Sequence, residues 1–105
     1  MDQERLRILK QFVEEEPEDP FNWYALALEE TKQNPKRAVE LFEYVLEKHS
    51  EYLPVYYQAG DLYLSLGNEE RAKEILLLGV NLARLKGEQK AMSEIRTLLD
   101  ELLMN

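Results

Sequence analysis

The sequence of 105 residues contains no cysteine, so it can form neither disulfide bonds nor thiolate metal sites, and it has no cysteine nucleophile. It contains one histidine, His49, which belongs to no H-x3-H or H-E-x2-H motif. We interpret His49 as the end of a helix, where a cation favours the helix dipole. No metal and no other cofactor is therefore expected.

Glycine and serine are also scarce, and they stand outside the motifs that use them in catalysis. The four glycines are scattered, so no glycine-rich phosphate loop is present, and no serine lies in a Gly-x-Ser-x-Gly motif. The acidic run Glu14–Glu16 lacks the glycine and the alternating ligands of a calcium loop, which favours a solvated turn. We expect no catalytic residue and no enzyme.

Basic residues are too few for a nucleic acid or an anionic membrane to be the main partner. Thirteen Lys and Arg face 21 Asp and Glu, for a net charge of −8. No apolar stretch is long enough to span a membrane, and no apolar signal-peptide core follows the polar start Met1 to Arg7. We therefore expect a cytoplasmic protein. The apolar content of 45% is ample for the core of a single domain covering residues 1–105.

Apolar residues recur at helical spacing through the whole chain and predict an all-α fold of about six helices. Pro17 and Pro20 end the first helix and open the second. We expect Asn34 to cap the third helix, which Pro35 opens, and Gly67 to end the fourth helix in a left-handed conformation before Asn68 caps the fifth. Short links make consecutive helices antiparallel. The expected helices cover residues 2–15, 20–33, 35–49, 54–66, 69–85 and 88–104.

Two segments repeat each other at a spacing of 33 to 34 residues. Trp23-x2-Leu26-Ala27 recurs as Tyr56-x2-Ala59-Gly60, and Ala38-x3-Phe42 recurs as Ala72-x3-Leu76. Each copy is a helix–turn–helix unit, which is typical of stacked helical hairpins. Large rings such as Trp23 should fill the gap within a hairpin, and small residues such as Gly60 should let helices approach closely. Gly79 lies inside a helix, so it should be packed tightly against a neighbour.

This pattern resembles the tetratricopeptide repeat, with its signature W-x2-L-G-x2-Y, then A-x3-F, then P. Glu30 replaces the tyrosine in the first copy, and Ser50 and Arg84 stand where the proline would be. The resemblance implies a right-handed stack of antiparallel helical hairpins, an α-solenoid. Its parts would be a half-repeat helix (1–17), repeat 1 (20–50), repeat 2 (53–86) and a capping helix (88–104).

The resemblance further implies that the first helix of each repeat lines a concave groove that binds a partner protein. The lysines and asparagines with which some members hold a terminal carboxylate are missing, so a hydrophobic segment suits this groove better. Ala91 and Ile95 of the last helix could join the site. The alternative is that a terminal helix covers these residues and they are plain core. The expected groove residues are Phe21, Tyr24, Leu28, Thr31 and Lys32 in the first repeat and Pro54, Tyr57, Asp61, Leu64 and Ser65 in the second.

The predicted function is a non-catalytic protein–protein interaction module that binds a peptide or helix of a partner. The alternative is self-association, for instance as a homodimer, through an apolar stripe on the last helix. The stripe is a candidate for such an interface because a terminal repeat helix normally has a polar outer face. The other interpretation is that the stripe is the inner face of a capping helix. Its residues are Leu98, Leu99, Leu102 and Leu103.

Overall fold

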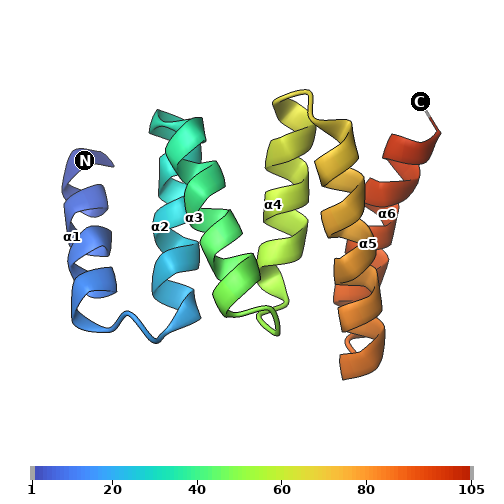
Figure 1. Cartoon of the computed structure of the whole chain (residues 1–105), viewed down its shortest axis with the longest axis horizontal. Helices are drawn as coiled ribbons and strands as arrows, with labels where there is room; N and C mark the ends of the chain where they lie inside the picture. Colours follow the sequence, from blue (N-terminus) through green and yellow to red (C-terminus); the bar gives the residue numbers. More distant parts are fainter. Residues whose placement is uncertain (1, 105) are drawn as a thin grey trace. The chain divides into compact units, whose positions relative to one another are not determined.

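The computed structural model of the chain describes residues 2–104, which form six α-helices and no strand (Figure 1). The prediction of an all-α fold is therefore confirmed, and the helix boundaries lie within one residue of those expected. The helices are α1 (Asp2–Glu15), α2 (Pro20–Gln33), α3 (Pro35–Lys48), α4 (Pro54–Ser65), α5 (Glu69–Lys86) and α6 (Gln89–Leu103).

Local capping chemistry fixes where three of the helices begin. Asp19 caps α2 by accepting a hydrogen bond from the Phe21 N–H (3.0 Å). Asn34 caps α3 and Asn68 caps α5, each accepting from the backbone N–H three residues on, at 3.3 and 3.2 Å. A side-chain oxygen at this position satisfies one of the donors that the first helical turn leaves unpaired. The two asparagine caps were predicted from the sequence and are confirmed.

Two glycines allow the chain to reverse direction after α4 and α5. Gly67 has φ +84° and Gly87 has φ +72°, both in the left-handed region that residues with a Cβ atom seldom adopt. The Gly87 N–H donates to the Arg84 carbonyl, and the N–H of the next residue, Glu88, donates to the Ala83 carbonyl. These bonds satisfy carbonyls at the end of α5 and stop the helix there.

The chain forms two compact units, one ending at Tyr52 and the other beginning at Leu53. In the first unit α2 packs against both α1 and α3. Its core is concentrated on α2 and α3, since Leu6 and Val13 of α1 each keep 8% of their surface exposed. The buried apolar residues of this unit are Leu6, Val13, Leu26, Ala27, Ala38, Leu41, Phe42 and Val45.

In the second unit α5 packs against both α4 and α6, and α4 also contacts α6. Small residues bring these helices together: a side chain on Gly60 would meet Leu76, and one on Gly79 would meet Tyr56 and Ile95. The tight packing expected at both glycines is thus confirmed. The buried apolar residues of this unit are Val55, Tyr56, Ala59, Ala72, Ile75, Leu76, Val80, Ala83, Ile95 and Leu99.

Length and hydropathy also bear on membrane insertion. Within residues 2–104, no helix combines the length and the apolar content needed to cross a bilayer.

Candidate partner-binding surface

The predicted binding residues of α2 recur at steps of three and four residues and therefore lie along one side of this helix. Phe21 begins the row with 55% of its surface exposed, which is unusual for so large an apolar side chain. Tyr24 and Leu28 are half-buried, and Lys32 at the C-terminal end is exposed. The row thus combines rings, an aliphatic side chain and a cation within reach of solvent.

Tyr24 is held by two further rings of the same unit. Its ring centre lies 5.5 Å from that of Tyr52, edge-on, and 6.5 Å from that of Phe42. These spacings are those of favourable aromatic pairs. Tyr52 stands in the link after α3, and no repeat position pointed to it from the sequence. It is half-buried and extends the aromatic surface around Tyr24.

The Tyr52 hydroxyl lies in an environment that disfavours its ionised form. Burial raises the pKa of Tyr52, and the neighbouring Tyr24 and the carboxylate of Asp19 raise that pKa further. A tyrosine is already protonated at neutral pH, so this shift matters only in alkaline solution. Tyrosines commonly bury the ring and keep a polar end that can form a hydrogen bond.

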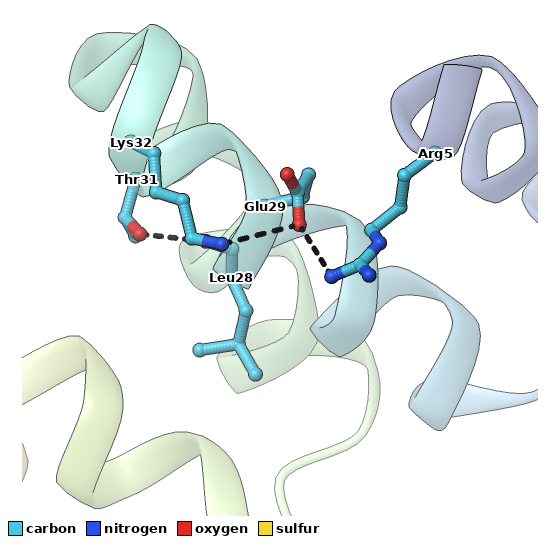
Figure 2. A network of polar contacts seen from close by, with 5 residues as sticks. All are labelled: Arg5, Leu28, Glu29, Thr31 and Lys32. Carbon is cyan, nitrogen blue, oxygen red and sulfur yellow. Dashed lines mark hydrogen bonds and ion pairs between the residues drawn. The ribbon is translucent and has the colours of Figure 1, made fainter. Parts of the chain in front are cut away.

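Lys32 forms an ion pair with a buried carboxylate that was not predicted from the sequence. Glu29, one turn earlier on α2, keeps only 4% of its surface exposed. Its Oε1 atom lies 3.7 Å from the Lys32 Nζ and 3.7 Å from the Arg5 Nη1 of α1 (Figure 2). Both distances are those of ion pairs rather than hydrogen bonds. The second oxygen, Oε2, is buried and has no hydrogen-bond partner among the described residues.

Glu30 is the other charged residue buried in α2, with 6% of its surface exposed. It occupies the place of the signature tyrosine and is buried there although its side chain is polar. Adjacent buried glutamates are expensive, because burial removes a carboxylate from water. Neither glutamate was expected in the interior, because Glu29 and Glu30 follow the end of an apolar run and glutamate is usual on a helix surface.

In the second unit, the predicted residues Tyr57, Asp61 and Leu64 follow one another on α4 at steps of four and three, and so share one side of that helix. Tyr57 and Leu64 are half-buried, and Asp61 is exposed. Asp61 has no ion pair or hydrogen bond to another described side chain. Its carboxylate is available for a cation from outside the chain.

The contribution expected from α6 is partly wrong. Ile95 keeps 2% of its surface exposed and lies beside Gly79, so it belongs to the core of the second unit rather than to a binding surface. Ala91, one turn earlier, is half-buried. Ile95 is buried because it fills the space that Gly79, which has no side chain, leaves open on α5. The sequence pattern did not show this contact.

The apolar stripe of α6 divides in the same way. Leu99 is buried with 6% of its surface exposed, and Leu98 and Leu102 are half-buried. Leu103, by contrast, is 55% exposed. Most of the stripe is therefore in contact with other residues of the chain.

Aromatic residues also join α2 to α3. Trp23 packs its ring against Tyr44 of α3, with ring centres 4.3 Å apart, and its Nε1–H donates to the Pro17 carbonyl at 2.7 Å. The prediction that Trp23 lies between the helices of one hairpin is confirmed. His49 caps the end of α3 and turns its ring edge-on toward Tyr44. In residues 2–104, no three or more His, Asp or Glu side chains are grouped so as to hold a metal ion.

Comparisons with known proteins agree on the architecture. The family model of the tetratricopeptide repeat matches residues 31–102. A tetratricopeptide repeat domain protein from Salinibacter ruber is 39% identical in its solution structure, with a TM-score of 0.78 over 82% of this chain and 88% of that one. Its crystal structure gives 38% identity and a TM-score of 0.76 over 81% and 96%. No curated protein matches the sequence.

A more distant structure shows the same fold. MamA is 16% identical, and its crystal structure matches with a TM-score of 0.69 over 98% of this chain and 67% of that one. The resemblance to the tetratricopeptide repeat that the sequence motifs indicated is thereby confirmed.

Proposed function

The chain belongs to the tetratricopeptide repeat family, and we propose that it is a non-catalytic module that binds an apolar segment of a partner protein. One observation carries the proposal: a row of large side chains on α2 begins with Phe21 at 55% exposure and continues through Tyr24, whose ring is fixed by Tyr52. Exposed rings that are already immobilised are good binding anchors, because they bury a large area with little loss of entropy.

The repeat extends this argument from α2 to α4. Tyr24 and Tyr57 are 33 residues apart and occupy the same place in successive repeats. In this family, the first helices of successive repeats present such places to one partner. We therefore propose the same binding role for the row of each unit, within an interaction module that covers residues 1–105. The proposed binding residues are Phe21, Tyr24, Leu28 and Lys32 in the first unit, with Tyr52 added from the structure, and Tyr57, Asp61 and Leu64 in the second.

The charges along the two rows define the partner further. Asp61 is exposed and pairs with no cation among the described residues, whereas Lys32 lies 3.7 Å from Glu29 and shares that carboxylate with Arg5. Asp61 is thus the unpaired charge among the proposed binding residues, and it has the sign of the net charge of −8. A segment with apolar or aromatic side chains and one lysine or arginine, which would pair with Asp61, complements it best.

The proposal is tested by replacing Tyr57 with a photo-crosslinking phenylalanine derivative and irradiating the protein in extracts of cells that produce it. We expect a discrete adduct, and mass spectrometry of the linked peptide should place it in an apolar segment with a basic residue. The same derivative at Glu47, exposed on α3, is the control. Equal adducts from both positions, or none from Tyr57, would refute the assignment of α4 to the site.

Self-association is a second candidate, and a specific observation favours it. Five leucines of the second unit are exposed: Leu66 by 50%, Leu77 by 44%, Leu78 by 51%, Leu85 by 85% and Leu103 by 55%. Apolar side chains left in water gain free energy when a second copy of the chain covers them. Under this alternative the chain is a structural repeat protein that assembles with itself.

A further inference from the structure

Helix α1 is held on α2 far less firmly than α2 and α3 hold each other. Of the α1 residues 3–15, only Leu6 and Val13 are buried, and each still has 8% of its surface exposed. On α3, Ala38, Phe42 and Val45 keep 1% or less. Ile8 and Phe12 of α1 remain 36% and 46% exposed. Little apolar surface is therefore removed from water when α1 docks.

The polar contacts between α1 and α2 compensate poorly for this. The Asn22 Nδ2 donates to the carbonyls of Phe12 (3.4 Å) and Glu16 (3.1 Å), and Gln3 Nε2 donates to Gln33 Oε1 at 3.3 Å on the surface. Two of these three hydrogen bonds are long, and all three lie toward the ends of α1 rather than at its middle. Near its N-terminal end, α1 makes one ion pair with α2 among the described residues, between Arg5 and Glu29.

The ion pair between Arg5 and Glu29 lies in the interface between α1 and α2, where burial of the carboxylate costs free energy. Glu29 has a side chain that is 5% exposed, whereas the side chains of Arg5 and Lys32 are 66% and 60% exposed. The two cations remain largely in water and share one oxygen at 3.7 Å, while Oε2 is buried without a partner (Figure 2). A buried carboxylate oxygen without a hydrogen bond destabilises the arrangement that buries it, and distant exposed cations offset little of this.

We infer that α1 is a detachable helix: it leaves α2 and returns while α2 and α3 stay folded, and Glu29 sets the balance between the two states. Undocking returns Glu29 to water and sacrifices only the small apolar contact of Leu6 and Val13. Docking covers the side of α2 that carries Glu29, the neighbour of Leu28 in the binding row. The fold thus contains a movable cover next to the proposed site, although the inference does not depend on that site.

Native-state hydrogen exchange of the full chain, resolved by residue, tests the inference. In the wild type, the amides of α1 should exchange through an opening that leaves α2 and α3 protected. Glu29→Met keeps the length and the helix propensity of the side chain and removes the buried charge. It should raise the protection of α1 by about tenfold and should change that of α3 much less.

Arg5→Met should have the opposite effect, because it leaves Glu29 with one cation fewer, and it should have little effect when Glu29→Met is already present. Arg7→Met is the matched control, since Arg7 pairs with Glu4 within α1 and touches no residue of α2 in an ion pair. The inference is overturned if α1 exchanges only together with α3, or if Glu29→Met leaves α1 unchanged or lowers its protection.

Discussion

Gly79 of α5 lies so close to Tyr56 of α4 that a Cβ atom on Gly79 would stand 2.7 Å from the Tyr56 Cβ. The same atom would lie 3.2 Å from the Ile95 Cδ1 of α6. The Tyr56 Cβ is attached directly to the backbone of α4, so it cannot turn aside as the end of a long side chain could. One glycine therefore allows α5 to approach both of its neighbours in the second unit.

We expect Gly79→Ala to destabilise the protein although alanine is the better helix former. Alanine favours the helix by about 1 kcal/mol. Overpacking of a core typically costs about 1–3 kcal/mol, so the free energy of unfolding should fall by a net of about 1 kcal/mol. Urea unfolding followed by circular dichroism measures this difference.

The control for this substitution is Asn81→Ala, an exposed position on the same helix. It gains helix propensity without meeting a neighbour and loses only an exposed hydrogen bond from Arg84, so the free energy of unfolding should stay within about 0.5 kcal/mol of the wild type. A Gly79→Ala variant more stable than the wild type would show that α4 can move away at no cost.

Gly60 of α4 makes the corresponding contact with α5, but there the neighbour is a side-chain end. A Cβ on Gly60 would lie 2.5 Å from the Leu76 Cδ2, and Leu76 is completely buried. Gly60→Ala should therefore lower the melting temperature, and Gly60→Leu should lower it much more. A Leu76→Ala substitution in a core normally lowers the free energy of unfolding by about 2–5 kcal/mol. The loss should be smaller in the Gly60→Ala variant, because Leu76→Ala removes the atoms that the new Cβ at position 60 would meet. Unfolding of the four proteins of this double-mutant cycle should show a coupling of about 1 kcal/mol. Strict additivity would contradict the contact.

The helices and their ends were predictable because short-range chemistry decides them. Asn34 and Asn68 cap helices with their own side chains, and Gly67 adopts a left-handed conformation for which it needs no distant partner. The close approach at Gly79 was also predictable, since a glycine inside a helix needs a compensating contact. At the two asparagine caps and at Gly67, the sequence within one or two turns contains the whole cause.

The features that escaped prediction depend on which elements meet. Tyr52 lies in a link, and only the course of the chain after α3 brings it to Tyr24. Glutamate is usual on helix surfaces, and Glu29 is buried only because it lies between α2 and α1. Ile95 was placed in the binding surface because helical spacing gives the side of a helix but does not say which neighbour covers it.

The raised pKa of Tyr52 predicts a loss of stability in alkaline solution. The folded state disfavours the ionised phenol, so its pKa exceeds that of the unfolded chain. This contribution to stability is complete below the unfolded value of about 10. It decreases as the pH rises through the folded pKa.

Tyr52→Phe cannot ionise, and the free energy of unfolding should therefore decrease less above pH 10 in this variant than in the wild type, while the two have similar pH dependence near neutrality. Urea unfolding at a series of pH values, with the phenolate absorbance of the folded protein recorded in parallel, measures both effects. Identical alkaline profiles for the two proteins would mean that Tyr52 is no more protected in the folded state than in the unfolded chain.

The remaining apolar surface of α6 predicts the oligomeric state. Ile95 and Leu99 are already buried within the second unit, and Leu98 and Leu102 are half-buried, so Leu103 is the main residue of this helix left for another copy. A stable interface removes roughly 800 Å² from each partner, far more than one leucine offers. We therefore expect that α6 alone holds no dimer together, so Leu103→Lys should leave the mass measured by light scattering unchanged from micromolar to millimolar concentration. A dimer that Leu103→Lys dissociates, while the exposed Leu77→Lys on α5 does not, would instead establish self-association through α6.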